Sequence, residues 1–384
     1  MLIFVVTPLY PNISNKQQGI YVYEQCKTLA KKGNRVIVLN ISPVRWNKWH
    51  SISCKEIQVH HEEGLVVYTL NPRGLLASKL PRYSVLSAWH NLKRLYKEAE
   101  LKYGKPDVLH SHFTFPAGYV TKKLSKKINI PFVVTEHYSL FLKDSLHKYI
   151  RIILNETISS ASEFICVSSS LKRAIENWTK TSKDIKVVPN LIDDRFKLYN
   201  NIEGDNKFVF FSAGNLTSSK RFDLLIESFC LAFDKHDDVY LSIAGDGREY
   251  EKLSNIISNE NRQKQITLLG RLGREEMLNQ YIACNCFVLP SDYETFGIVY
   301  REAMAVGRPV ISTKNGGIEE NWEDKFGLLV PVGDKLALSN AMVKVYGNIE
   351  NYDLEYISNK CLEKHSSEAV GFSIHTILKN VAGS

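Results

Sequence analysis

The sequence predicts an α/β fold made of two doubly wound domains, and three observations support this prediction. Short apolar runs recur along the chain, helical amphipathic stretches separate most of them, and the pattern restarts after a polar interval at residues 200–206. The chain has 384 residues. Two cores are expected for this length, because a single hydrophobic core stops growing near about 250 to 300 residues.

The first half contains apolar runs typical of strands that are buried on both faces of a parallel sheet. The predicted strands are Leu2–Val6, Arg35–Asn40, Val66–Thr69, Val108–His110, Phe132–Thr135, Phe164–Val167 and Ile185–Val188. Helical spacing between them predicts helices at Tyr21–Lys32, Ala117–Lys127 and Ser169–Trp178. This alternation predicts the first doubly wound domain.

The second half repeats the pattern. Its predicted strands are Phe208–Ala213, Val239–Ala244, Ile266–Leu269, Cys286–Leu289, Pro309–Ser312 and Leu328–Val330, and its predicted helices are Arg221–Phe233, Glu249–Ser258 and Arg274–Ala283. Apolar residues at helical spacing in Ser366–Asn380 predict a terminal helix. Ligands of such sheets bind at the carboxyl ends of the strands, so we expect two domains that face an interdomain cleft.

Charge is divided unequally between the two halves. Residues 1–190 hold 28 Lys and Arg against 13 Asp and Glu, a net charge of +15, and the remaining residues hold 21 against 28, a net charge of −7. A basic half fits anionic lipid headgroups, a phosphate-bearing acceptor or nucleic acid, and a solvated lysine surface is the alternative. The basic residues lack interleaved aromatic platforms and a reader motif, which argues against nucleic acid.

Composition also bears on the compartment. No apolar run approaches the roughly 18 residues of a membrane span. Met1–Val6 lacks a basic leader and is interpreted as a strand. Seven cysteines without metal-like paired spacing favour free thiols in a reducing compartment, and we expect Cys284 and Cys286 to pack in the interior. We therefore expect a cytoplasmic protein.

The segment Pro290–Val310 carries the most informative pattern. It follows an apolar strand, passes through a loop that contains Gly297, and enters a helix near Ile298. Free backbone N–H groups at such a helix start, together with the helix dipole, form a site for phosphate oxygens. Glu294 precedes this site and Glu302 lies about one turn into the helix. The two acids alone are weak evidence, since surface helices are rich in glutamate.

In this setting the acid pair resembles the signature of glycosyltransferase family 4, whose members have the GT-B fold. The resemblance implies that Glu294 orients the transferred sugar, that Glu302 binds the ribose, and that residues 295–298 (Thr295, Phe296, Gly297 and Ile298) contact the phosphate or sugar through their backbone. It implies a retaining transfer that needs no metal and no other cofactor. The nucleotide sugar is then the donor substrate.

Further segments of the second half carry the same resemblance. Gly214–Ile226 resembles the family's diphosphate loop, in which Lys220 corresponds to the lysine that neutralises the leaving diphosphate. Asn215 stands where the family usually has an arginine, and Arg221 stands in place of a glycine and could supply the missing charge. Leu269–Leu272 resembles the segment whose backbone contacts the nucleobase, so Leu272 is a further donor-binding candidate.

In the first half, Gly19 matches the family's glycine loop, where the missing side chain lets the backbone approach a phosphate. Asp107–His112 resembles the strand end whose last histidine points at the donor sugar, which makes His112 a catalytic candidate. Thr135–His137 resembles a second strand end that lines the cleft. Without the resemblance, a histidine at a strand end is more often structural.

The resemblance also implies the domain boundaries. Pro189–Asp193 resembles the hinge, so residues 1–195 form the predicted acceptor domain and residues 196–365 the predicted donor domain. The last helix, within residues 366–384, resembles the segment that crosses back and packs on the first domain.

A narrower likeness covers Pro8–Pro11, Gly19–Gln25 and His112–Gly118. It resembles bacterial members that build exopolysaccharide, capsule or teichuronic acid-type polymers, often on lipid carriers at the inner membrane face. A possible membrane contact patch consists of Leu75, Leu76, Leu80, Pro81, Tyr83, Lys93, Arg94 and Lys97, and burial of its apolar members is the alternative.

The functional hypothesis is therefore the transfer of a sugar from a UDP- or GDP-sugar to a hydroxyl of a lipid-linked or oligosaccharide acceptor. Its proposed catalytic residues are Glu294, His112 and Lys220. A nucleotide-sugar epimerase or a phosphorylase on the same fold is one alternative. A nucleotide-sugar-binding subunit without turnover is the other, and Asn215 is its only support.

Overall fold

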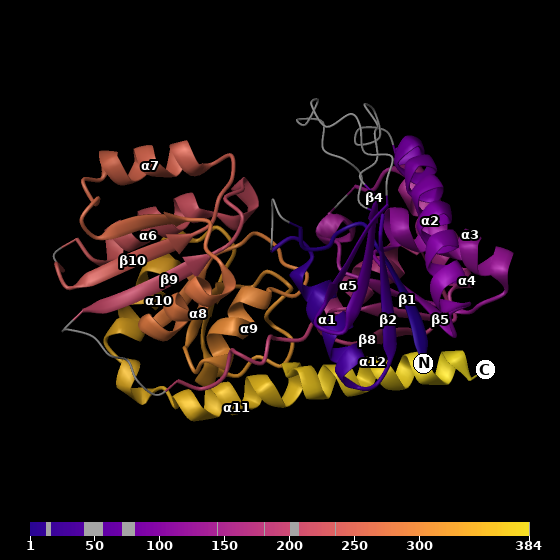
Figure 1. Ribbon diagram of the computed structural model, residues 1–384. Helices are drawn as coiled ribbons and strands as arrows, with labels where there is room; N and C mark the ends of the chain where they lie inside the picture. The colour runs from indigo at the N-terminus through magenta and orange to yellow at the C-terminus, as the bar shows by residue number, and fades with distance from the viewer. Residues whose placement is uncertain are drawn as a thin grey trace. The chain divides into compact units, whose positions relative to one another are not determined.

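The computed structural model describes residues 1–12, 17–41, 57–70, 81–143, 145–179, 181–199, 207–234 and 236–383 (Figure 1). These residues form two compact units. Unit 1 consists of Met1–Leu191 with Ser367–Ser384, and unit 2 of Ile192–Ser366. Each unit contains one sheet with a Rossmann-like strand order, which confirms the predicted fold class. The polar interval at residues 200–206 lies outside the described residues.

The sheet of unit 1 has the order β3-β4-β2-β1-β5-β6-β7-β8. Its strands are β1 (Leu2–Thr7), β2 (Arg35–Asn40), β3 (Ile57–Glu62), β4 (Leu65–Leu70), β5 (Val108–His112), β6 (Phe132–Glu136), β7 (Glu163–Cys166) and β8 (Ile185–Val187). All neighbouring strands are parallel except β3, which pairs antiparallel with β4 at the edge. The exposed and polar sequence of β3 explains why apolar periodicity did not predict it.

Helices cover both faces of this sheet. They are α1 (Ile20–Lys31), α2 (Pro81–Tyr103), α3 (Tyr119–Ile128), α4 (Lys148–Ser160), α5 (Ser169–Thr179) and α12 (Ser367–Ala382). Alternate residues of β1 point to opposite faces. Ile3 and Val5 join the core formed with α1 and α12, whereas the ring of Phe4 packs against Tyr96 of α2.

The terminal helix α12 packs against α1, although α1 lies near the start of the sequence and α12 near its end (Figure 1). A Cβ atom on Gly371 of α12 would lie 2.3 Å from Thr28 Cγ2 of α1, so only a glycine allows this approach. Val370, Ile374, Leu378 and Val381 of α12 complete the core of unit 1.

The sheet of unit 2 has the order β11-β10-β9-β12-β13-β14 and is parallel throughout. Its strands are β9 (Phe208–Ala213), β10 (Val239–Ala244), β11 (Ile266–Gly270), β12 (Cys286–Leu289), β13 (Val310–Thr313) and β14 (Gly327–Val330). Its helices are α6 (Phe222–Ala232), α7 (Tyr250–Asn259), α8 (Arg274–Ala283), α9 (Ile298–Ala305), α10 (Lys335–Tyr346) and α11 (Leu354–His365). Phe210 packs on Phe229 of α6, and its neighbour Phe211 packs on Tyr281 of α8.

Both sheets reverse their strand order in the middle, between β1 and β5 in unit 1 and between β9 and β12 in unit 2. Ligands of open α/β sheets bind at the carboxyl ends of the strands beside such a reversal. The loops after these four strands contain Gly19, residues 214–221 and residues 290–297, and His112 ends β5 itself. The topology therefore places most of the candidate residues where a ligand is expected.

No helix in the described parts of the chain is both long enough and apolar enough to cross a membrane. Six cysteines in these parts are buried free thiols, Cys284 and Cys286 among them.

Candidate functional site

The loop before α9 is shaped by Gly297. This glycine precedes the helix with a φ of 69° and a ψ of 60°, in the left-handed region. A Cβ atom at this position would lie 2.4 Å from the ring of Tyr300. The sequence therefore needs glycine here both for the backbone conformation and for the space. The turn leaves the first N–H groups of α9 at the carboxyl end of β12.

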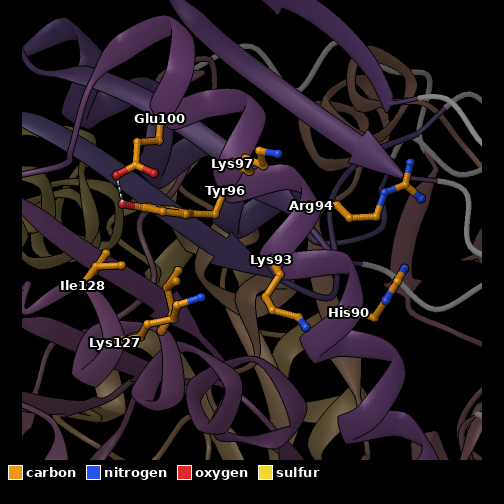
Figure 2. A pocket seen from close by; sticks show the side chains of 9 residues that line it. His90, Lys93, Arg94, Tyr96, Lys97, Glu100, Lys127 and Ile128 are labelled. Atoms are coloured by element: carbon orange, nitrogen blue, oxygen red, sulfur yellow. Dashed lines mark hydrogen bonds between the residues drawn. The ribbon is translucent and has the colours of Figure 1, made fainter.

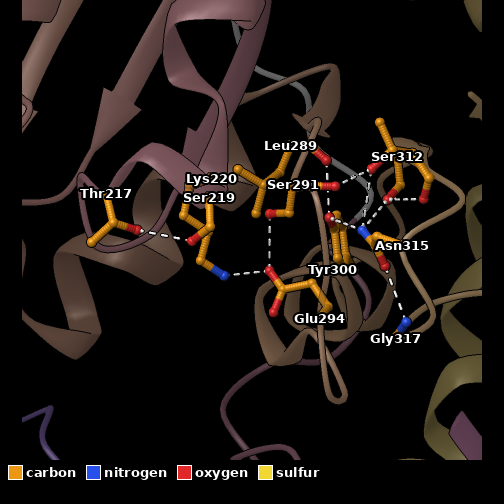
Figure 3. A network of polar contacts seen from close by, with 11 residues as sticks. Thr217, Ser219, Lys220, Leu289, Ser291, Glu294, Tyr300, Ser312, Asn315 and Gly317 are labelled. Carbon is orange, nitrogen blue, oxygen red and sulfur yellow. Dashed lines mark hydrogen bonds and ion pairs between the residues drawn. The ribbon is translucent and has the colours of Figure 1, made fainter. Parts of the chain in front are cut away.

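Lys220 and Glu294 form an ion pair across the strand reversal of unit 2 (Figure 3). Lys220 ends the turn that follows β9, and Glu294 lies in the loop that follows β12. Ser291 Oγ also donates a 3.0 Å hydrogen bond to Glu294 Oε1. A backbone bond of 2.8 Å from Asp292 N to Ser219 O holds the two loops together. Two of the three proposed catalytic residues thus meet at one end of the sheet.

Asn315 supports the Glu294 loop from a third strand end, after β13 (Figure 3). Its backbone oxygen accepts a 3.0 Å bond from Glu294 N, and its side-chain amide donates a 2.9 Å bond to Tyr300 Oη. Tyr300 Oη in turn donates to the Leu289 backbone oxygen at 2.9 Å. Gly317 lies so close to Glu294 that an added Cβ would be 2.5 Å from Glu294 Cβ. No local pattern in the sequence distinguishes Asn315 or Gly317 as a site residue.

Glu302 is only 2% exposed and has separate partners from Glu294. Arg274 Nη1 donates a 2.5 Å bond to Glu302 Oε1, and Tyr281 Oη donates a 3.1 Å bond to Glu302 Oε2. Arg274 Nη2 also lies 3.6 Å from Asp193 Oδ2. The two acids of the signature therefore belong to two different networks, one around Lys220 and one around Arg274.

The predicted substitute for the family arginine is itself paired. Arg221 has a left-handed backbone with a φ of 53° and contacts Asp292 at 3.2 Å and Asp223 at 3.4 Å. Asn215 is exposed on the loop after β9, and Leu272 packs partly buried between β11 and α8. Thr295 is half-buried, and Phe296 is buried with its ring 5.4 Å from that of His365.

In unit 1, Gly19 precedes α1 with a φ of 67°. An added Cβ at Gly19 would lie 2.4 Å from the backbone oxygen of Leu9, so Gly19 lies directly against the Leu9 backbone. Glycine is therefore needed at position 19 because any side chain would clash with the Leu9 backbone.

His112 belongs to a buried group of three histidines at the carboxyl ends of β5 and β6. Its Nδ1 lies 2.9 Å from Nε2 of His137, and the two rings are stacked with centroids 5.2 Å apart. The ring centroids of His110 and His112 are 4.4 Å apart, and His110 Nε2 lies 2.9 Å from Thr135 Oγ1. Burial lowers the pKa of His110 and of His137 to about 3 and that of His112 well below its usual value. The three rings are therefore neutral near pH 7.

Glu136 links the two strand ends that carry these histidines. Its carboxylate accepts backbone bonds from His137 N at 2.7 Å, Tyr138 N at 2.8 Å and Thr114 N at 2.7 Å. Burial raises the pKa of Glu136, and the backbone bonds oppose this rise because they stabilise the charged form. The sequence predicts Glu136 at a strand end but does not indicate these backbone contacts.

The site residues offer a defined set of chemical groups. In unit 2 an ammonium, a carboxylate and the N–H groups of a helix start lie at strand ends, and a second carboxylate lies on that helix. This set suits an anionic, hydroxyl-rich ligand. In unit 1 the buried Nε2 of His112 has no hydrogen-bond partner within the described residues. Such an atom is expected to face a ligand or water, because unpaired buried polar atoms are costly.

Two family models match the chain in succession. The model described as Glycosyltransferase Family 4 matches residues 18–196, and the model described as Glycosyl transferases group 1 matches residues 195–357.

Curated relatives agree with these matches. An uncharacterized glycosyltransferase of Methanocaldococcus jannaschii is 33% identical over 247 residues, which cover 64% of this chain and 66%, just under two thirds, of the relative. N-acetyl-alpha-D-glucosaminyl L-malate synthase of Bacillus anthracis is 26% identical over 357 residues, 88% of this chain and 85% of the relative.

Solved structures show the same fold. Sucrose-phosphate synthase of Thermosynechococcus elongatus has a TM-score of 0.82 at 20% identity, with both chains covered completely. HepE of Anabaena in complex with UDP and glucose has a TM-score of 0.75 at 17% identity, covering 99% of this chain and 100% of that one.

Proposed function

Since the chain belongs to glycosyltransferase family 4 and has the GT-B fold, we propose that it transfers a sugar, with retention, from a nucleoside diphosphate sugar to a hydroxyl acceptor. The observation that carries the proposal is the meeting of Lys220 and Glu294 at the strand reversal of unit 2. A cation and a hydroxyl-binding carboxylate at this place fit a diphosphate joined to a sugar.

We propose a UDP-sugar as the donor. The complexes of HepE with UDP and glucose, and with UDP-glucose, support this choice by likeness of fold. Glu302 accepts hydrogen bonds from the ribose hydroxyls, and Arg274 and Tyr281 hold its carboxylate in place. The backbone of residues 295–298, at the start of α9, binds phosphate or sugar oxygens. Asn215, Arg221, Leu272 and Gly19 complete the proposed donor-binding set.

The proposed reaction breaks the bond between the sugar and the diphosphate while the acceptor hydroxyl attacks from the same face. Negative charge grows on the leaving phosphate oxygen, and Lys220 stabilises this charge. The leaving phosphate takes the proton of the acceptor hydroxyl, so no side chain is needed as a covalent nucleophile. Glu294 and His112 orient the transferred sugar through its hydroxyls.

Kinetics of two variants test the donor site. Lys220→Ala should lower kcat by on the order of 10²- to 10³-fold, because it removes a group that acts mainly in the transition state. Glu302→Ala should raise the Kd for UDP, measured by titration calorimetry. Lys344→Ala changes an exposed lysine of α10 and is the matched control, with unchanged kinetics. Unchanged kinetics and binding in both test variants would overturn the assignment.

The same assay separates the alternative activities. An epimerase converts the nucleotide sugar without an acceptor, and a phosphorylase requires phosphate. A binding subunit without turnover shows neither transfer nor slow hydrolysis of the donor. A thermal-shift screen of nucleoside diphosphates and their sugars identifies the donor, because a ligand that binds the folded state raises its apparent stability.

We further propose a lipid-linked or oligosaccharide acceptor in bacterial cell-surface polysaccharide synthesis, with an anionic membrane as a surface for unit 1. A pocket of about 430 Å³ between α2 and α3 supports the membrane contact (Figure 2). It is lined by His90, Lys93, Arg94, Tyr96, Lys97, Glu100, Leu124, Lys127 and Ile128. Four Lys and Arg side chains outnumber one acid there, and Glu100 accepts a 2.7 Å bond from Tyr96 Oη.

Exposed apolar residues on α2 extend this basic surface. Tyr83 and Leu86 are 52% and 63% exposed. With His90, Lys93 and Lys97 they follow a spacing of three and four residues, which places all five on one helix face. Apolar side chains beside cations are typical of helices that lie in a membrane interface. Leu75, Leu76 and Leu80 of the predicted patch lie outside the described residues.

Vesicle sedimentation tests this surface. The wild-type protein should bind vesicles that contain phosphatidylglycerol more tightly than vesicles of phosphatidylcholine alone. The double change Lys93→Gln and Lys97→Gln should weaken the first binding by roughly 30-fold, at about 1 kcal/mol per cation. The changes Lys264→Gln and Lys344→Gln in unit 2 are the control for net charge. Equal loss in both double variants would show that only overall charge matters.

A further inference from the structure

Arg221 is a residue with a long side chain at a position whose backbone favours glycine. Its φ is 53° and its ψ is 40°, in the left-handed region between the turn Ser218–Lys220 and α6. A Cβ atom makes this conformation unfavourable, whereas a glycine adopts it freely. The backbone of Arg221 therefore lowers stability, and a role of its side chain is expected.

The side chain of Arg221 joins two loops. Its Nη1 donates a 3.2 Å hydrogen bond to Oδ1 of Asp292, in the loop after β12. Its Nε donates a longer bond of 3.4 Å to Oδ1 of Asp223, in the first turn of α6. Lys252 Nζ lies 2.9 Å from Oδ2 of Asp223 and holds that carboxylate from its other side. The guanidinium is thus anchored on α6 while it contacts Asp292.

Two further contacts between the same loops lie beside this ion pair. Asp292 N donates a 2.8 Å bond to Ser219 O, and Lys220 pairs with Glu294. Asp292 is therefore held twice, through its backbone by Ser219 and through its carboxylate by Arg221. Since Asp292 precedes Glu294 by two residues, these contacts also limit where the Glu294 carboxylate can lie.

Stability does not explain the ion pair between Arg221 and Asp292. Their side chains are 31% and 34% exposed, and water screens charges that are exposed to this degree. Such pairs contribute little to the free energy of folding. The pair nevertheless restricts the loop after β12, and a displacement of about 1 Å in a reacting site can lower the rate strongly.

We propose that Arg221 is a positioning residue, whose ion pair with Asp292 holds the loop after β12 so that Glu294 stays in place to orient the transferred sugar. The inference rests on the proposed function, since it states how Arg221 serves the donor site. Arg221 belongs to the proposed donor-binding set through the loop that it holds. Direct binding of the diphosphate by Arg221 is the outcome that the experiment must separate from this role.

A double-mutant cycle tests the ion pair. Arg221→Gly and Asp292→Asn should each lower kcat by on the order of tenfold, with little change in KM for the donor. The double variant should lose no more than either single variant, because all three lack the same contact. Arg221→Lys keeps a cation and should recover part of kcat. Losses that add in the double variant would overturn the proposal.

Melting temperatures separate positioning from folding. Arg221→Gly should melt no lower than the wild type, because glycine adopts the left-handed conformation freely. Glu227→Gln is the matched control for Asp292→Asn, since it removes an ion pair between α6 and Lys335 of the same unit and should leave kcat unchanged. A loss of kcat that always accompanies a lower melting temperature would contradict the positioning role.

Titration calorimetry with UDP separates positioning from direct binding. Arg221→Gly and Asp292→Asn should both bind UDP with nearly the Kd of the wild type. If Arg221 contacts the diphosphate itself, Arg221→Gly weakens UDP binding, whereas Asp292→Asn releases the guanidinium and does not weaken it. That pattern would show that the ion pair is not the role of Arg221.

Failure of this inference is distinct from failure of the proposed function. If Lys220→Ala leaves transfer unchanged, the proposed donor site is wrong. If Lys220→Ala slows transfer while Arg221→Gly and Asp292→Asn match the wild type, only the positioning role of Arg221 is wrong.

Discussion

Arg274 carries a charge into the interior of unit 2. It pairs with Glu302 of α9 and with Asp193, and its guanidinium lies 4.5 Å from the centre of the Phe196 ring. Burial lowers the pKa of Arg274, but the carboxylates of Glu302 and Asp193 raise it by more than burial lowers it. The pKa of Arg274 therefore lies above its usual value. Burial alone would raise the pKa of Asp193, but Arg195 and Arg274 bring it down to about 2. These contacts offset the cost of removing the charges from water.

Arg274→Ala should lower the free energy of unfolding by about 3 to 5 kcal/mol, because it leaves the buried carboxylate of Glu302 without its cation. The measurement is urea unfolding followed by circular dichroism. The double variant Arg274→Met and Glu302→Gln should recover part of this loss, since neither charge is then buried alone. If the double variant is less stable than Arg274→Ala, Arg274 does not stabilise unit 2 through its ion pair with Glu302.

At the scale of the element, α9 depends on the residue that precedes it. Gly297 adopts a left-handed conformation beside the ring of Tyr300, and Tyr300 in turn is bonded to Asn315 and to the backbone of β12. The start of the helix is therefore fixed by one glycine and by a tyrosine one turn later. A helix start held in this way keeps its free N–H groups at a constant place.

Gly297→Ala should destabilise unit 2 by at least about 1 to 2 kcal/mol, the cost of a left-handed non-glycine residue, with the clash against Tyr300 in addition. Gly347→Ala is the matched control. Gly347 follows α10 with a φ of −75°, and an added Cβ would meet only Val343 O at 3.6 Å. Thermal unfolding of both variants checks the difference, and similar melting temperatures would contradict it.

At the scale of the whole molecule, the last helix belongs to the first unit. Chain order places α12 after all of unit 2, yet its apolar residues fill the core beside α1. Unit 1 is therefore completed only when α12 has been made. The two units are linked twice by the backbone, before Ile192 and after Ser366.

Leu378→Ala should destabilise unit 1 by about 2 to 5 kcal/mol, because Leu378 is fully buried and its truncation leaves a cavity. Phe372→Ala changes a residue of the same helix that is 65% exposed and should have little effect. Hydrogen exchange resolved by peptide checks where the change falls. Loss of protection in the β9–β14 sheet, with β1 and β5 unaffected, would show that α12 does not stabilise unit 1.

Much of the fold could be predicted from the sequence because its signals are local. Arg35–Asn40, Phe208–Ala213, Val239–Ala244, Cys286–Leu289 and the helix Arg274–Ala283 have the predicted bounds, since a buried strand or an amphipathic helix shows its period within a few residues. The edge strand β3 was missed because its exposed polar residues carry no apolar period. The roles given to the site residues stay predictions.

The sequence by itself determined the α/β class, the repeated strand and helix pattern, and the glycine turn between Glu294 and Glu302. Only the tertiary structure decided the partners of these residues. Arg274 and Glu302 are separated by 28 residues, Lys220 and Glu294 by 74, and His112 and His137 by 25. Such pairs depend on which strands lie side by side, and no periodicity within a segment encodes that order. The acid pair can therefore be recognised in the sequence, whereas the cations that pair with it and the histidine that contacts His112 become visible only in the fold.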